Sequence, residues 1–256
     1  MIQKSQLSLS IICILLKMYN ASIMFFRNAF LVDITSEKIG RVLKLDSIES
    51  SKLWKGMDAV IFNSWHWWLH TGRKQPWDFI EDGNNTYKDM DRLVAYRKAL
   101  NTWARWIDSN VDPTKTQVFF QGVSPDHAGK LSHSHTFKKF YNKGIIVFLS
   151  NGHPPSDISF SLSTSGVGPN CGGQTEPLPK YRRGQHPAEL VLEKVLRTMS
   201  TPVHLLNVTG LSQLRIDGHP SVYGHGGHGD MDCSHWCLAG VPDTWNQLLY
   251  AAIIQN

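Results

Sequence analysis

The chain has 256 residues, of which 41% are hydrophobic and 18% charged, and its formal net charge at pH 7 is +5. These values are typical of one globular domain with a sizeable core, and they exclude a fibrous or a highly charged, disordered chain. The basic residues are scattered without a Lys/Arg-rich run, so nucleic acid is not an expected partner. The mild excess of positive charge suits polyanionic glycans.

Residues 1–17 contain a short apolar core from Leu7 to Leu16. The core has the length of a signal-peptide core, but no small-residue cleavage site follows it, and it is too short to span a bilayer. We therefore expect this segment to be signal-like or poorly ordered. Three N-x-S/T sequons are compatible with a secretory route, at Asn20, Asn84 and Asn207.

Residues 18–45 have the pattern of β-strands. The apolar run ASIMFFRNAFLVDI is followed by a turn at Gly40 and by the alternating stretch RVLKL. Most of these side chains are expected in the core. Arg27 is the exception, because a charged side chain inside so apolar a run needs an anionic or carbonyl partner. A substrate-binding role and a structural ion pair are both open for it.

Residues 58–63, DAVIFN, are typical of a buried parallel strand, and the next sixteen residues, SWHWWLHTGRKQPWDF, hold four tryptophans and two histidines. Ligands of open α/β sheets bind beyond the carboxyl ends of the strands, so this segment is where a site is expected. Indole rings stack on sugars and donate hydrogen bonds from N–H, which makes a glycan groove one interpretation. The other is packing in the core. The tryptophans concerned are Trp65, Trp67, Trp68 and Trp77.

Further along the chain, predicted helices and strands alternate. Residues 88–109 have apolar side chains at helical spacing after early acidic residues, and residues 116–123 read as a second buried strand. A helix over 187–200, a short strand over 203–208 and a final helix over 242–255, capped by Asp243, follow. The final helix is expected to dock on the sheet through Trp245, Leu248, Leu249 and Ile253. This alternation predicts an α/β fold with a parallel, doubly wound sheet. The apolar face expected for the helix over 187–200 consists of Leu190, Val191, Val195 and Leu196.

Residues from about 128 to 170 break the alternation. They are weakly patterned and rich in Ser, Gly and Pro, and they contain one stretch, IIVFLS, that could form a lone strand. Because a structureless loop of this length is uncommon inside a compact domain, we expect an insertion of low structural order. Its histidines, His133 and His135, are expected to be solvated rather than to bind metal.

The densest group of reactive side chains lies between Tyr223 and Tyr250. Asp232 and His235 are three residues apart, so on one helical turn the carboxylate could accept the imidazole N–H. Such a pair is the orienting half of a catalytic triad, in which the acid fixes a histidine that serves a hydroxyl nucleophile as general base. His219, His225 and His228 also permit a metal site, as does the stretch Cys233-x-His235-x-Cys237. Neither a catalytic nor a structural zinc set is complete, however.

The four cysteines form no set of C-x-x-C pairs, which favours disulfide chemistry over a zinc ribbon. Cys233 and Cys237 flank His235, and their four-residue separation on a turn makes a bridge between them awkward. Each is therefore expected to have its partner elsewhere.

The stretch from Asp232 to Asn246, DCSHWCLAGVPDTWN, resembles the C-terminal signature of the plant trichome birefringence-like family. These proteins are polysaccharide O-acetyltransferases of the GDSL/SGNH-hydrolase type, also described as PC-esterases. One position departs from the pattern, because Ala239 stands where the family usually has proline. The blocks MFFRNAFLV and NSWHWW are also similar to the family, and the resemblance covers about residues 18–127 and 171–256.

The resemblance implies a parallel-sheet, three-layer sandwich of the SGNH-hydrolase type, with Asp232 and His235 as catalytic residues. It also implies a disulfide between Cys171 and Cys233 and leaves Cys237 as a free thiol. The residues to which it assigns an oxyanion or substrate-binding role are Asn63, His66, Trp67, Trp68 and Arg27. We expect the loop that bears the first four to leave the same edge of the sheet as Asp232 and His235 and to line one groove with them.

The family likeness further implies acetyl transfer to hydroxyls of cell-wall polysaccharide such as xylan. Acetyl-CoA would be the donor, and no bound metal or cofactor is expected. The location implied is the Golgi apparatus, in a type II membrane protein whose anchor is weak or missing from this chain.

The catalytic nucleophile of the family has no counterpart in this sequence. The family carries its serine in an N-terminal Gly-Asp-Ser block, whereas the nearest string here is Leu45-Asp46-Ser47, which lacks the glycine that lets the backbone approach. We therefore expect an N-terminal segment, 1–17, and a PC-esterase domain, 18–256, that is incomplete at its N-terminus. Two alternatives stay open: a catalytically inactive, glycan-binding relative and, more remotely, a metal-dependent hydrolase.

Overall fold

The computed structural model describes residues 2–8, 11–125, 127, 145–150, 171–180, 186–224 and 231–255. The chain divides into two compact units. The first comprises Met1–Phe120, Lys143–His153 and Pro187–His204, and the second comprises Gln121–Asn142, Pro154–His186 and Leu205–Asn256.

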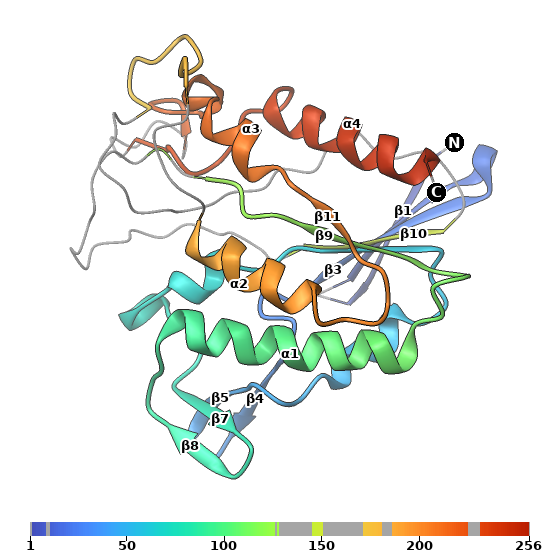
Figure 1. Ribbon diagram of the computed structural model, residues 1–256, viewed down its shortest axis with the longest axis vertical. Coiled ribbons are helices and arrows are strands. Elements are labelled where there is room, and N and C mark those ends of the chain that lie inside the picture. Colours follow the sequence, from blue (N-terminus) through green and yellow to red (C-terminus); the bar gives the residue numbers. More distant parts are fainter. Residues whose placement is uncertain are drawn as a thin grey trace. The chain divides into compact units, whose positions relative to one another are not determined.

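The N-terminal strands of the first unit form an antiparallel meander (Figure 1). They are β1 (Ile2–Ser8), β2 (Ile11–Leu16) and β3 (Ala21–Arg27), and each pairs with the next because short connections permit only antiparallel neighbours. Residues 1–17, expected to be signal-like or poorly ordered, thus contribute two paired strands and the first residue of a 3-10 helix, Lys17–Tyr19.

The same sheet continues through β10 (Ile145–Ser150), β6 (Ala59–Phe62) and β9 (Gln117–Gln121). β10 is antiparallel to both β3 and β6, whereas β6 and β9 run parallel. The order is β1-β2-β3-β10-β6-β9-β11, in which β11 is His204–Leu206. The parallel sheet predicted from the sequence is therefore a mixed sheet, and IIVFLS is an inner strand rather than a lone one.

Helix α1 (Arg92–Asn110) lies in the long connection between the two parallel strands, β6 and β9. The Asp91 carboxylate caps its N-terminus by accepting from Leu93 N and Val94 N, both at 3.0 Å. The fully buried Trp103 ring packs edge-on against Phe62 and Phe120, which fixes α1 on the strands. The predictions of this helix and of both strands are confirmed.

Helix α2 (Pro187–Leu196) packs alongside α1 in the first unit (Figure 1). The prediction of this helix is confirmed, but of its predicted buried face only Val195 is buried. Leu190 is 39% exposed. The buried positions are one helical stripe, Ala188, Leu192 and Val195, together with Glu189.

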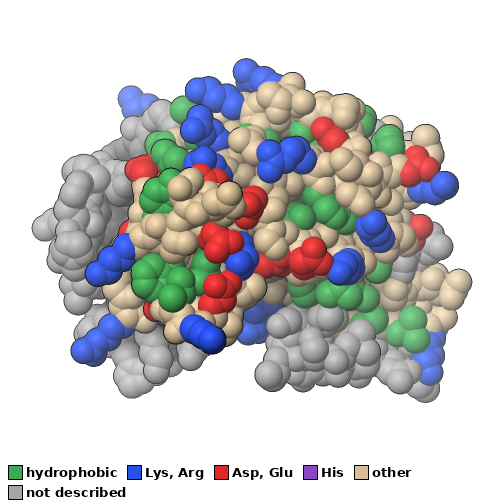
Figure 2. Space-filling view, turned by 90° about the horizontal axis from the view of Figure 1, so that it is seen from below, with side chains coloured by type: hydrophobic (Ala, Val, Ile, Leu, Met, Phe, Trp, Pro, Cys, Tyr) green, Lys and Arg blue, Asp and Glu red, His purple; other side chains and the backbone are tan. Residues whose placement is uncertain are grey.

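A second, four-stranded sheet in the first unit has the order β4-β5-β7-β8. Its strands are β4 (Asp33–Glu37), β5 (Gly40–Lys44), β7 (Phe79–Asp82) and β8 (Asn85–Tyr87), and only the β5–β7 pair is parallel. Ion pairs such as Arg41–Asp78 and Lys44–Glu81 join its strands and loops. Figure 2 shows positive and negative side chains interspersed, consistent with the scattered charges of the sequence.

The remaining short helices of the first unit are 3-10 turns, Glu49–Trp54, His66–Leu69 and Gly72–Lys74. The second unit contains α3 (Thr209–Gln213), a 3-10 turn, Ile216–Gly218, and α4 (Val241–Ile254). No helix in the described part of the chain is both long and apolar enough to cross a membrane.

Helix α4 begins as predicted, with the Asp243 carboxylate accepting from Gly240 N at 2.6 Å. Trp245 and Leu249 are buried, and the Trp245 indole N–H donates to Ser212 Oγ of α3 at 2.9 Å. Leu248, expected on the same buried face, is 37% exposed. The docking of α4 on the sheet stays a prediction.

Candidate functional site

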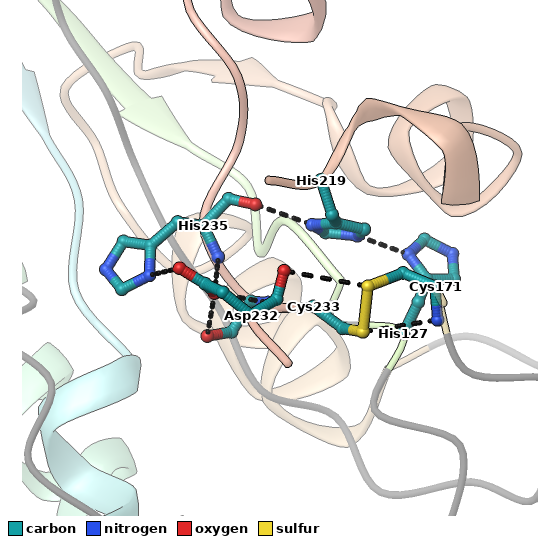
Figure 3. The surroundings of a disulfide bond; sticks show 7 residues. His127, Cys171, His219, Asp232, Cys233 and His235 are labelled. Carbon is teal, nitrogen blue, oxygen red and sulfur yellow. Dashed lines mark hydrogen bonds and ion pairs between the residues drawn. A yellow bond between two sulfur atoms is a disulfide. The ribbon is translucent and has the colours of Figure 1, made fainter. Parts of the chain in front are cut away.

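The Asp232 carboxylate and the His235 imidazole form a direct pair, with Oδ2 2.8 Å from Nδ1 (Figure 3). The predicted contact is confirmed, but the local structure is not a helical turn. Asp232 Oδ1 accepts from the backbone N–H groups of Ser234 at 3.2 Å and His235 at 3.0 Å. The carboxylate thus closes a tight loop around itself, as short polar side chains do in turns.

The two members of this pair differ in exposure, since the side chain of Asp232 is 3% exposed and that of His235 is 24% exposed. Burial alone would raise the pKa of the Asp232 carboxyl, but hydrogen bonds from the His235 side chain and backbone hold that pKa well below its usual range. Asp232 is therefore ionised at neutral pH. A carboxylate on Nδ1–H selects the tautomer with the lone pair on Nε2, which is the state a general base needs.

The backbone of Asp232 is also held by hydrogen bonds, and its side chain packs closely against a glycine. It pairs with Ser221 through two backbone hydrogen bonds, of 2.9 and 3.0 Å. A Cβ added to Gly224 would lie 2.4 Å from Asp232 Cβ and 2.9 Å from Oδ2. Only glycine fits at this position without displacing the acid.

A disulfide joins Cys233, the neighbour of Asp232, to Cys171 across 62 residues, with a Cα–Cα distance of 5.4 Å. The backbone of His127 lies between the two half-cystines, because His127 N donates to Cys233 O and His127 O accepts from Cys171 N. The pairing implied by the family resemblance is confirmed. Cys13 and Cys237 are free thiols, as expected for Cys237.

The tryptophan-rich segment after β6 forms much of the core of the first unit. Trp68 is fully buried, its indole N–H donates to Ser64 Oγ at 3.1 Å, and its ring packs edge-on against Phe30. Trp65 and Trp77 are 5% and 1% exposed. A buried indole cannot stack on a sugar, so the glycan-groove interpretation is wrong for Trp65, Trp68 and Trp77, and the core alternative is correct.

Comparison with known proteins matches residues 3–141 and 146–252 to the PC-esterase family, described as a GDSL/SGNH-like acyl-esterase family found in Pmr5 and Cas1p. The chain belongs to this family. The PC-esterase match begins at residue 3 and includes most of residues 128–170. It is therefore wider than the blocks at 18–127 and 171–256 from which the resemblance was first inferred.

Curated relatives from Arabidopsis thaliana are similar over nearly the whole chain. Trichome birefringence-like 43 is 54% identical over 240 residues, which is 93% of this chain and 57% of that protein. Trichome birefringence-like 39 is 47% identical over 241 residues, with the same coverage, and trichome birefringence is 38% identical over 253 residues, 92% of this chain and 36% of that protein. The chain thus spans somewhat more than half the length of the first two relatives.

The other PC-esterase positions singled out in the sequence lie in the first unit. Asn63, His66 and Trp67 are half-buried, directly after β6, and the Trp67 ring meets His70 edge-on. Arg27 is exposed at the end of β3, so burial demands no partner for it, contrary to expectation. Ser47 donates to Asp33 Oδ2 at 2.6 Å, where it helps to shape a loop.

The Asp232–His235 pair belongs to the second unit and the segment after β6 to the first. The prediction that both line one groove therefore stays a prediction.

Two histidines, His127 and His219, lie next to the pair (Figure 3). The sequence marked only His219, as one of the histidines of the metal alternative. His127 and His219 are 4% and 6% exposed, their rings are joined at 2.6 Å, and His219 Nδ1 lies 2.6 Å from the backbone oxygen of His235. Their separation of 92 residues leaves no local pattern to detect.

The metal interpretation finds little support in these geometries. The Cys233 sulfur is part of the disulfide and is no longer a thiolate ligand. Within the described ranges, no three His, Cys, Asp or Glu side chains are grouped so that they could hold a metal ion. His133, His135, His225 and His228 lie outside the described residues.

Proposed function

We propose that this chain carries the acid and the general base of an acyl-transfer site, and that the reaction is O-acetylation of polysaccharide hydroxyls. The observation that carries the proposal is the 2.8 Å hydrogen bond between Asp232 Oδ2 and His235 Nδ1. Membership of an acyl-esterase family supports the reaction class. The polysaccharide acceptor rests on the resemblance to the trichome birefringence-like proteins.

In the proposed reaction, His235 Nε2 takes the proton of a serine hydroxyl as the oxygen attacks the acetyl carbonyl of acetyl-CoA. The imidazolium then gives this proton to the departing thiolate, which leaves an acetyl-serine. In the second half, His235 takes the proton of an acceptor hydroxyl, and the acetyl group moves to that oxygen as the proton returns to serine. The Asp232 carboxylate stabilises the imidazolium in both halves.

The serine itself is the part of the proposal that the printed sequence lacks, since it contains no Gly-Asp-Ser string. The relatives are longer than the part that this chain matches. We infer that the nucleophile comes from a region equivalent to the unmatched part of those relatives. The SGNH-type three-layer arrangement belongs to the same proposal.

The roles that the family resemblance implies for residues of the first unit are kept as proposals. Asn63 directly follows β6, at the carboxyl end of a parallel strand, where α/β folds place ligands. Its side-chain amide could donate to the oxyanion, and half-buried His66 and Trp67 could contact the acceptor. Exposed Arg27 is kept as a contact for acidic glycans.

We propose that the protein is located in the secretory pathway, in the Golgi apparatus. The Cys171–Cys233 disulfide supports this location, because such bonds form and persist in oxidising compartments.

The test compares the chain alone with the chain joined to the N-terminal region of trichome birefringence-like 43. Acetyl transfer from acetyl-CoA to xylan oligosaccharides is expected only for the joined chain. Asp232→Asn should lower kcat by about 10⁴-fold, because the histidine adopts the wrong tautomer. His235→Gln should abolish transfer, whereas His204→Gln, at an exposed position in β11, should not.

Binding of xylan without transfer in any form would favour the inactive glycan-binding alternative. If the Asp232→Asn variant transferred acetyl groups as fast as the unaltered joined chain, the Asp232–His235 pair would not be the catalytic one.

A further inference from the structure

A chain of three hydrogen bonds passes through two buried imidazoles to the backbone of His235. His127 Nε2 lies 3.0 Å from the carbonyl oxygen of Gln213, and His127 Nδ1 lies 2.6 Å from His219 Nε2. His219 Nδ1 then lies 2.6 Å from the carbonyl oxygen of His235. Both imidazoles are more than nine-tenths buried.

The carbonyl groups at the two ends of this row of hydrogen bonds determine how many protons the two imidazoles hold. A carbonyl oxygen only accepts, so His127 Nε2 and His219 Nδ1 must each carry a proton. The remaining nitrogens face each other at 2.6 Å. Two bare nitrogens would oppose their lone pairs, and two N–H groups would oppose their protons. All three contacts are satisfied only when one proton lies between the rings.

We propose that His127 and His219 form a buried imidazole–imidazolium pair that holds three protons on four nitrogens, and that this pair fixes the backbone of His235. One positive charge therefore resides on the pair. Asp232 holds the His235 ring through Nδ1, and the histidine pair holds its carbonyl group, so the residue is restrained at both ends.

The charge is assigned to His127. Burial lowers the pKa of His219 to about 4, the His235 carbonyl opposes this, and the charge of His127 lowers that pKa further. A neutral His219 donates from Nδ1 and accepts at Nε2, which leaves His127 as the imidazolium with two N–H donors. Hydrogen bonds to charged donors are the shorter and stronger kind, in keeping with the short contact between the rings.

The surroundings of the pair are compatible with one charge. The titratable groups that act on His219, apart from His127, are Asp232, which favours a cation, and His235. The sulfurs of Cys171 and Cys233 next to His127 are in the disulfide and do not titrate. The buried Trp236 ring lies 4.1 Å from the His219 ring centre and 6.2 Å from that of His127.

Nitrogen NMR on the unaltered full chain, labelled with ¹⁵N-histidine, counts these protons directly. At pH 7 we expect His127 with two protonated nitrogens, His219 protonated only at Nδ1, and a coupling between the two facing nitrogens. Two neutral rings, or rings without a coupling between them, would overturn the proposal. No variant has to fold for this measurement.

Unfolding equilibria measured against pH provide a second test. Both histidines have a pKa of about 6.5 when unfolded. His219, whose pKa is lowered, contributes less stability as pH falls below that value. The proton that the proposal assigns to His127 stabilises the folded chain, so this contribution is lost as pH rises above the same value. The pair therefore contributes most near pH 6.5, and the unfolding constant should change up to about tenfold per pH unit on each side.

In the His127→Gln variant, the change of the unfolding constant with pH above about pH 6.5, the alkaline side of the dependence, should disappear. The matched control, His204→Gln at an exposed strand position, should keep both sides. If the alkaline side is missing from the unaltered chain as well, His127 is neutral and the proposal fails.

The role of the pair in positioning the base rests on the proposed function, whereas its proton count does not. In the joined chain, His219→Leu should lower kcat more than it changes KM and should broaden or shift the His235 ring signals, while His219→Gln, which can still donate to the carbonyl, should restore part of both. Coupled rings without any acetyl transfer would refute only the proposed function. Neutral, uncoupled rings would refute the pair whatever the activity.

Discussion

At the scale of single residues, the space around Asp232 is as restrictive as its hydrogen bonds. We predict that Gly224→Ala displaces Asp232, because the new Cβ would lie 2.4 Å from Asp232 Cβ. The variant should lose about 1–3 kcal/mol of unfolding free energy, as overpacked sites do. It should also lose the carboxylate bond seen in the ¹⁵N signals of His235.

The matched control is Gly173→Ala, whose Cβ would meet nothing within 4 Å and which adds only the strain of a positive φ. Intact His235 signals in the Gly224→Ala variant would contradict the close packing described for Asp232.

The Asp232 carboxylate should also shape the pH dependence of stability. Its pKa is lowered in the folded chain, so its stabilising contribution is present above the unfolded pKa of about 3.9 and is lost as pH falls below it. Asp232→Asn is therefore expected to cost about 1–3 kcal/mol at pH 7. The two unfolding curves should converge in acid.

Asp217→Asn is the control for this titration, since Asp217 pairs with Arg215 at a more open position. A difference between Asp232→Asn and the unaltered chain that stays constant from pH 7 to pH 2 would contradict the assignment of the stability to an ionised carboxylate.

The sequence predicted the residue pairs that have local or family patterns and missed those that do not. Asp232 and His235 were predicted because three residues separate them, although the turn that joins them is made by the carboxylate rather than by a helix. His127 and His219 meet only because the fold brings distant loops together, and a single sequence contains no trace of such a contact.

At the scale of elements, the segment after β6 shows that composition alone does not separate a binding surface from a core. We predict that Trp68→Ala costs about 3–5 kcal/mol of unfolding free energy, the usual range for a buried large aromatic. Trp67→Ala is the matched comparison, because Trp67 is half-buried, and it should cost less.

Chemical denaturation followed by circular dichroism measures both variants. If Trp68→Ala keeps its stability and loses only glycan binding, the ring serves a groove and not the core.

Strand positions were predictable, whereas strand pairing was not. The apolar runs of β3, β6 and β9 are short, continuous and bounded by turn residues, which is enough to place each strand. Pairing depends on which distant strand lies between two others in the sheet. β10 lies between β3 and β6, although it comes from a weakly patterned stretch of the sequence. A similar limit applies to α2, whose apolar residues lie on two faces, so that of the face predicted from the sequence only Val195 is buried.

At the scale of the whole molecule, the sequence predicted an α/β protein and its family, but not its division into two units. Length and composition are those of one domain, and each unit is assembled from segments that are far apart in the chain. Discontinuous units of this kind have no boundary in composition, so nothing in a linear pattern marks them.

The disulfide gives the last prediction, because it is the one covalent link in the described residues between distant parts of the second unit. Closing a loop across 62 residues is worth about 4 kcal/mol in the chain-entropy model. We expect the double variant Cys171→Ser, Cys233→Ser to lose about 2–5 kcal/mol of unfolding free energy. It should also lose the coupling between the His127 and His219 rings, because the His127 backbone is held between the two half-cystines.

Cys237→Ser is the control, because Cys237 is a free thiol in the same loop. This variant should change neither the unfolding free energy nor the coupling between the two histidine rings. Peptide mapping without reduction should recover one bridge, Cys171 to Cys233, with Cys13 and Cys237 open to alkylation. A bridge that includes Cys237, or a double variant as stable as the unaltered chain, would show that the loop carrying His235 is anchored in another way.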